Sequence, residues 1–127
     1  MNAAAGVVDL ASSHSVADTA DRLESALRGK GIQVFARIDQ AAAAHAVGLN
    51  MRPMVLIIFG DPKVGTPLME KYPTLALDLP LKALTWERAD GKVFLSFNSP
   101  AYLKERHGME AEPFVPLVGL LKAVAGE

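Results

Sequence analysis

The sequence predicts an α/β (α+β) fold, a two-layer sandwich in which helices pack on a mixed sheet of about five strands. Three observations support this prediction. An unbroken apolar run from Met54 to Phe59 is typical of a strand buried on both faces. Apolar residues recur at helical spacing from Val16 to Leu27, and Asp90-Gly91 between two apolar runs indicates a hairpin. Early strand-helix-strand units favour parallel crossovers and the hairpin adds an antiparallel pair, so we expect a mixed sheet.

The composition is that of one globular domain, which we expect to span residues 1–127. Half of the residues are apolar and 21% are charged, and a formal net charge of -1 argues against nucleic acid as a partner. There is no cysteine, which excludes disulfides and thiol chemistry. The longest apolar run is far shorter than the roughly 20 residues of a membrane span, and the N-terminus lacks the basic region of a signal peptide. We therefore expect a cytoplasmic protein without a membrane partner.

The first half of the chain alternates strands and helices. A short strand is expected from about Gly6 to Ser12, and Ser13 or Ser15 can cap the helix that follows. Alternating apolar and polar residues predict a half-buried strand over residues 32–38. The alanine-rich segment from Ala41 to Val47 predicts a short helix.

The strand over residues 54–59 leads into a stretch rich in glycine and proline. We expect a turn from Gly60 to Gly65, then a helix with Thr66 as its N-cap and Pro67 at its first position. Tyr72 precedes a proline, so this helix should be short.

The second half of the chain contains the hairpin and two helices. The hairpin strands are expected over residues 81–88 and 92–98, and residues 73–79 should be irregular. Ser99 and Pro100 predict the start of a helix that ends at His107. A last helix beginning near Pro113 carries an apolar stripe formed by Phe114, Leu117, Leu121 and Val124.

An ordered series of motifs resembles the family called domain of unknown function 302. These motifs are FGDPKVGTPLM, LDLPLKALTW and DGKVFLSFNSPAYLKERHG, within a match from about Val16 to Met109. The resemblance implies a small α/β fold, usually a stand-alone bacterial protein, and a homodimer; it implies no established activity. Gln40, Asp61 and Phe97 depart from the family pattern, in which His, Asn and Tyr are common. Gln40 cannot act as an acid or base in place of histidine.

The stretch from Gly60 to Met69 is the best candidate for a binding site. Gly60 and Gly65 would let backbone amides converge, Thr66 would begin a helix whose dipole favours negative charge, and Lys63 adds a positive charge. Asp61 opposes an anion, and the glycine spacing matches neither a P-loop nor a dinucleotide fingerprint. In the competing interpretation these residues only shape a strand-to-helix turn, with Asp61 bonding the local backbone.

Lys82 and Trp86 form a second candidate. They share one face of an expected strand and could line one side of a cleft, although a lone tryptophan is more often a core residue and a lysine at the start of a strand is more often solvated. His14, His45 and His107 are not spaced as metal ligands along one helix, so we expect no metal. His107, at the end of a helix, is typical of a dipole partner.

These patterns favour a protein that binds a small anionic or polar ligand at residues 60–69, with itself as its expected partner in a homodimer. The alternative is an interaction or homodimerisation module without catalysis. A third possibility is an enzyme that uses Asp61, Lys63 or His45, although no acid-base constellation is visible. The sequence indicates no cofactor.

Overall fold

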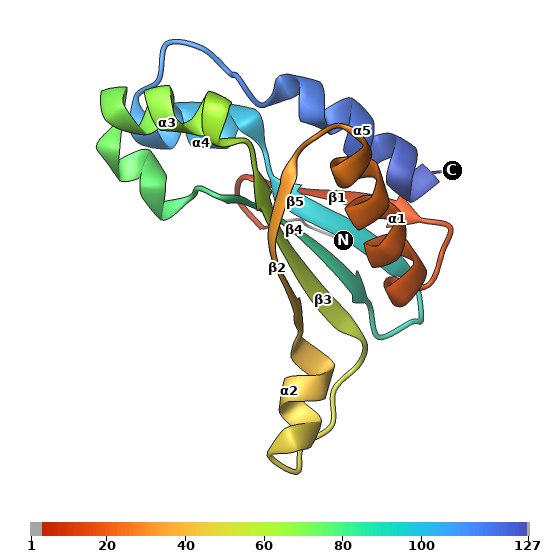
Figure 1. Cartoon of the computed structure of the whole chain (residues 1–127). Coiled ribbons are helices and arrows are strands. Elements are labelled where there is room, and N and C mark those ends of the chain that lie inside the picture. Colours follow the sequence, from red (N-terminus) through yellow and green to blue (C-terminus); the bar gives the residue numbers. More distant parts are fainter. Residues whose placement is uncertain (1–3, 127) are drawn as a thin grey trace.

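A five-stranded sheet with helices packed on it forms the protein, as seen in a computed structural model that describes residues 4–126 (Figure 1). The elements in chain order are β1 (Val7–Ser12), α1 (Val16–Gly29), β2 (Gln33–Asp39), α2 (Gln40–Ala46), β3 (Met54–Gly60), α3 (Pro62–Lys71), the 3-10 helix η1 (Pro73–Leu77), β4 (Leu81–Glu87), β5 (Val93–Asn98), α4 (Pro100–His107) and α5 (Val115–Gly126). The predicted α/β class and the strand number are confirmed.

The sheet has the strand order β1-β5-β4-β3-β2, and every neighbouring pair is antiparallel. The expectation of a mixed sheet with parallel neighbours was therefore wrong. Helix α1 carries the chain from one edge of the sheet to the other, so β1 and β2 are not neighbours. Helix α2 buries no residue and does not cross the face of the sheet as the helix of a parallel crossover does. The chain therefore re-enters the sheet beside β2, and β3 runs antiparallel to it.

Helices α1 and α5 cover one face of the sheet and enclose the core (Figure 1). Ser15 caps α1 as predicted, because its side chain accepts a hydrogen bond from the Asp18 amide at 3.0 Å. The predicted apolar stripe of α1, Val16, Ala20, Leu23 and Leu27, is buried against the sheet. On β3, Val55, Ile57 and Phe59 point into this core.

The opposite face of β3 is less covered than the sequence suggested. Met54, Leu56 and Ile58 are only half-buried, so the expectation of a strand buried on both faces was wrong. An apolar run without alternation reports on side-chain type and cannot show how many layers cover the sheet. None of the described helices is long and apolar enough to span a bilayer.

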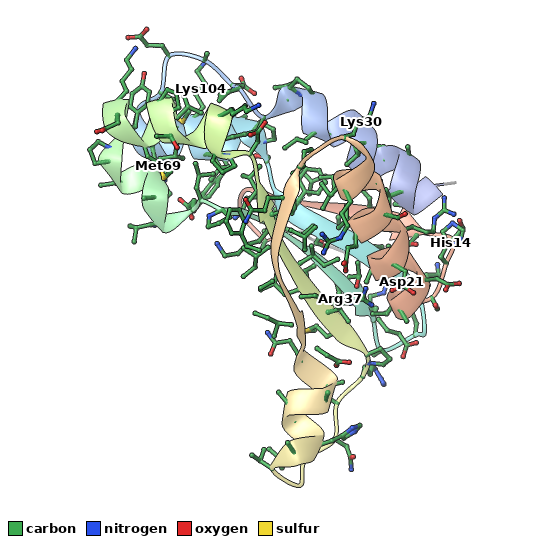
Figure 2. All side chains as sticks on the ribbon, viewed as in Figure 1. His14, Asp21, Lys30, Arg37, Met69 and Lys104 are labelled. Atoms are coloured by element: carbon green, nitrogen blue, oxygen red, sulfur yellow. The ribbon has the colours of Figure 1, made fainter. Side chains whose placement is uncertain are left out.

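An ionic contact joins the edge strand β2 to α1 (Figure 2). Arg37 donates to the Asp21 carboxylate at 2.7 Å and reaches Glu24 at 3.4 Å. The hydrogen bond to Asp21 is the main cause that raises the pKa of Arg37. Because these side chains are all partly exposed, solvent screens the interaction and it contributes little to stability.

The second half of the chain follows the prediction with small changes. The loop of the β4-β5 hairpin spans residues 88–92, and Gly91 is the residue in this loop with a positive φ, +85°. Ser99 caps α4 by accepting from the Tyr102 amide at 3.0 Å. The segment expected to be irregular contains η1, and α5 begins at Val115, after Pro113 and Phe114.

Candidate functional site

Helix α3 begins immediately after β3, with Asp61 as its N-cap. The Asp61 carboxylate accepts a hydrogen bond from the Lys63 amide at 3.0 Å, and Pro62 occupies the first helical position. The prediction of Thr66 as N-cap after a Gly60–Gly65 turn was wrong, because Thr66 and Pro67 lie inside the helix. Asp-Pro and Thr-Pro are both good helix starts, and the chain uses the first of them.

This early helix start removes the convergence of amides that motivated the anion hypothesis. Gly60 is the last residue of β3, and the amide of Gly65 donates to the Asp61 carbonyl oxygen at 2.8 Å within the helix. The local bond between Asp61 and Lys63 is the one expected from the competing interpretation, in which these residues shape the strand-to-helix junction.

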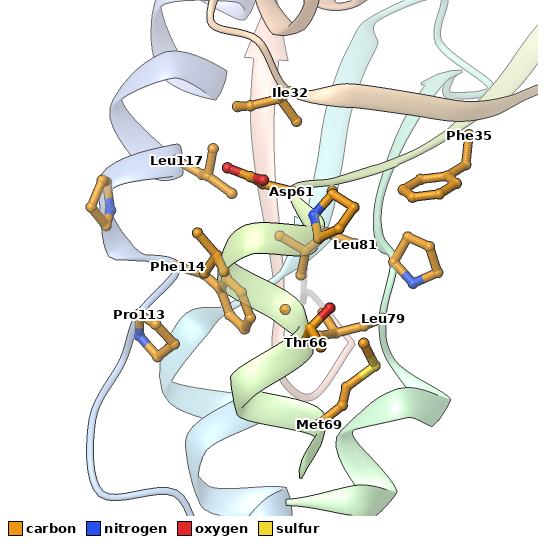
Figure 3. A pocket seen from close by; sticks show the side chains of 16 residues that line it. Ile32, Phe35, Asp61, Thr66, Met69, Leu79, Leu81, Pro113, Phe114 and Leu117 are labelled. Atoms are coloured by element: carbon orange, nitrogen blue, oxygen red, sulfur yellow. The ribbon is translucent and has the colours of Figure 1, made fainter. Parts of the chain in front are cut away.

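A pocket of about 490 Å³ lies beside α3 (Figure 3). Its walls come from the start of β2, the β3-α3 junction with α3, the segment between η1 and β4, and the start of α5. The lining residues are Ile32, Phe35, Gly60, Asp61, Pro62, Val64, Gly65, Thr66, Met69, Leu79, Pro80, Leu81, Pro113, Phe114, Pro116 and Leu117. Four segments of the chain therefore meet around one cavity.

The pocket walls are almost entirely apolar. Asp61 and Thr66 contribute the polar side chains, and no lysine, arginine or histidine lines the cavity. Gly65 is buried in this wall, where a β-carbon would meet Leu79 at 3.5 Å and Met69 at 3.8 Å. The absence of a side chain at Gly65 therefore leaves part of the pocket volume open.

The sequence-predicted site residues divide between two regions. Gly60, Asp61, Gly65 and Thr66 line the pocket, whereas the side chain of Lys63 does not line it and this residue is exposed. The Lys82 side chain donates to the Pro80 carbonyl oxygen at 3.3 Å and borders a much smaller cavity of about 20 Å³.

Trp86 lies farther along β4 and belongs to a polar network on the sheet. Its indole nitrogen donates to the Ser96 hydroxyl at 2.8 Å, and Ser96 donates to the Asp9 carboxylate at 2.5 Å. The ring of Trp86 also stacks on Phe94 with 5.3 Å between the centroids. Lys82 and Trp86 share a strand face as predicted, but Trp86 does not line the pocket.

His107 has contacts that the sequence did not suggest. It lies in the last turn of α4, as expected, but its side chain is buried between the Asp78 carboxylate at 2.6 Å and the Thr74 hydroxyl at 2.9 Å. Asp78 also accepts from Arg106 at 3.2 Å. These hydrogen bonds connect η1 and its C-cap Asp78 to the end of α4. Within residues 4–126 no group of histidines and carboxylates is arranged to hold a metal ion.

The sequence of the chain matches the model of a known family. The model of the family described as "Domain of unknown function DUF302" matches residues 8–124. The chain belongs to the DUF302 family. The match is longer at both ends than the resemblance over residues 16–109. Of the three departures from the family pattern, Asp61 serves as an N-cap, a role that asparagine also fills, and Phe97 is buried in the core.

A solved structure has the same fold as this DUF302 protein. The crystal structure of an uncharacterized conserved DUF302 protein from Bacillus stearothermophilus superposes with a TM-score of 0.79. The match covers 96% of this chain and 97% of that chain at 19% sequence identity. At this identity, the similarity establishes the fold.

Longer proteins contain a region similar to this DUF302 chain. Proteins named "Fluoride-specific ion channel FluC 1" from Brucella suis and Brucella abortus are 46% identical to it over 104 residues, which is 82% of this chain. The matched region is 41% and 38% of those proteins. Because the chain spans about two fifths of their length, the activity named for the whole proteins is not assigned to it.

Proposed function

We propose that this protein binds a small, mainly apolar molecule in the pocket beside α3. The observation that carries the proposal is a cavity of about 490 Å³ with apolar walls. Ligand sites in proteins are typically clefts of roughly 300–1,000 Å³ lined by apolar and aromatic side chains with a few polar groups. Phe35 and Phe114 provide the aromatic walls, and Asp61 and Thr66 provide the polar groups.

This proposal changes the type of ligand from the one expected from the sequence. An anionic or polar ligand needs donors or cations, and the Gly65 amide is bonded within α3 while Lys63 lies outside the lining. An apolar ligand instead gains by removing its own surface and the pocket walls from water. The geometry therefore supports a hydrophobic ligand better than an anionic one.

The experiment is a fluorescence titration with the neutral apolar probe N-phenyl-1-naphthylamine. The wild-type protein should enhance the probe's fluorescence in a saturable manner. Gly65→Leu places a side chain against Leu79 and Met69 and should reduce the enhancement at least tenfold. Gly119→Leu, at an exposed position of α5 with open space around it, is the matched control and should leave binding unchanged.

Thermal unfolding of both variants shows whether each remains folded. The proposal fails if the wild-type protein does not bind the probe, or if folded Gly65→Leu binds it as well as the wild type does.

A second candidate is self-association, favoured by an apolar arm that includes α2. This arm comprises α2 and the residues after it, from Gln40 to Met51, and extends away from the sheet (Figure 1). Helix α2 has seven residues and buries none of them, and Val47 and Leu49 are 72% and 63% exposed. A helix this short is marginal without packing partners. A second copy would supply them.

The position of the arm suits a symmetric dimer. Strand β2 leads into α2 and is an edge strand, so its outer side pairs with no other strand within residues 4–126 and could pair with a strand of a second copy. An antiparallel pair of β2 strands would be related by a two-fold axis, and each copy would then offer the same surface. We infer that the homodimer expected from the resemblance forms through β2 and the arm.

Light scattering coupled to size-exclusion chromatography tests this second candidate. The wild-type protein should have twice the mass of the chain, and the double variant Val47→Ser, Leu49→Ser should have the mass of one chain. Leu77→Ser changes an equally exposed leucine on η1 and should stay dimeric. A monomeric wild-type protein contradicts the proposal.

A further inference from the structure

We propose that the ligand of the pocket is a cationic amphiphile, an apolar body that carries a protonated amine held by Asp61. The inference rests on the proposed function, because it names the chemical class of ligand for the same pocket. It follows from the charge of the lining, the bonds already made at the start of α3, and the aromatic walls.

The lining carries one charge, and that charge is negative. Asp61 is the only ionisable side chain among the residues that line the pocket. One carboxylate oxygen accepts from the Lys63 amide at 3.0 Å, and the other has no hydrogen-bond partner within residues 4–126. The carboxylate lies between Ile32 and Leu117 in the close view (Figure 3). A carboxylate at an apolar site favours a cationic donor over a neutral group.

The backbone amides at the start of α3 already donate within the helix, so they do not offset the repulsion between Asp61 and an anion. The amides of Val64 and Gly65 both donate to the Asp61 carbonyl oxygen, at 2.9 and 2.8 Å, and the Lys63 amide is used by the cap. An anionic head group would therefore meet the Asp61 carboxylate without gaining the donors that usually bind anions at a helix start. We therefore expect the pocket to bind a fatty-acid carboxylate more weakly than an alcohol of the same chain length.

The two nearby lysines do not reverse this charge. The Lys63 side chain is not part of the lining, and Lys82 also lies outside it, with its ammonium group donating to the Pro80 carbonyl oxygen at 3.3 Å. Phe35 and Phe114, in contrast, line the cavity, and aromatic faces attract ammonium groups. An ammonium group therefore has two kinds of favourable contact in this pocket.

Competition of three ten-carbon probes against N-phenyl-1-naphthylamine at pH 7 tests the inference. Decylamine, decanol and decanoate share an alkyl chain and differ in head-group charge. Decylamine should displace the probe at a concentration about tenfold lower than decanol, and decanoate should be the weakest of the three. Raising the salt concentration should reduce the advantage of decylamine, because the carboxylate is only half-buried.

Asp61→Asn removes the charge and keeps an N-cap residue, so the helix start should be preserved. This variant should bind decylamine about tenfold more weakly and decanol as before. Asp39→Asn is the matched control: Asp39 caps α2 by accepting from the Ala42 amide at 2.9 Å, away from the pocket. It should leave all three affinities unchanged.

The possible results separate the two proposals. If the wild-type protein binds decanol and decylamine equally, or if Asp61→Asn binds decylamine as tightly as the wild type, the amine inference is overturned while the apolar pocket stands. If neither the fluorescent probe nor any of the three competitors binds, the proposed function itself fails, and the amine inference fails with it.

Discussion

Replacing Gly65 by Ala should stabilise the protein and at the same time weaken binding in the pocket. Gly65 lies inside α3 without a positive φ, so alanine fits the backbone. Alanine is more favourable than glycine in a helix by about 1 kcal/mol. Its methyl group would lie in ordinary van der Waals contact with Leu79, at 3.5 Å, and burying one such group adds about 0.8 kcal/mol. The expected gain is roughly 1.8 kcal/mol.

Gly119→Ala separates the two contributions. Gly119 is an exposed glycine within α5 with no atom near its missing β-carbon, so it should gain only the helix-propensity part, about 1 kcal/mol. Both variants and the wild type are compared by urea unfolding, and affinity for N-phenyl-1-naphthylamine is measured in parallel. Gly65→Ala should be the more stable and the weaker binder of the two. A Gly65→Ala protein that is less stable than the wild type would refute the reasoning about this wall.

Three further predictions test the fold. Gly6→Ala should lose about 3 kcal/mol of unfolding free energy, because φ is +75° and the new β-carbon would overlap the side chain of Tyr102; Tyr102→Ala in the same chain should recover part of the loss. Leu23→Ala should cost about 3 kcal/mol in urea unfolding, because it empties a fully buried position. Arg88 lowers the pKa of Asp90 in the folded hairpin, so this contribution to stability is present above the ordinary aspartate pKa and is lost as the pH falls below it. Asp90→Asn should therefore be less stable than the wild type at pH 7 and should differ from it less at pH 2, measured by thermal unfolding.

Local patterns predicted the helices and strands because their causes are local. Ser15 caps α1, and the apolar stripe that follows is the buried one, since capping and periodicity act within one element. Asp90-Gly91 predicted the hairpin for the same reason. The relative direction of β2 and β3 could not be predicted from local patterns. It depends on whether the connection between the two strands packs across the face of the sheet, and α2 does not.

The site was predicted in part. The stretch after β3 does line the pocket, but the helix start predicted from the sequence was Thr66-Pro67, whereas the helix begins at Asp61-Pro62. Phe114 and Leu117 also line the cavity, although they lie far along the chain from Asp61. No local pattern could show that these residues meet Asp61, so the apolar character of the site emerged only from the structure.

Binding of an apolar amine beside α3 is the central claim, and an NMR titration tests it most directly. Decylamine is added to the isotopically labelled protein while backbone amide signals are followed. The claim predicts saturable shifts concentrated at Gly60, Asp61, Gly65 and Leu117, and much smaller shifts in the same region for Asp61→Asn. Shifts confined to α2, or no saturable shift at any amide, would contradict it.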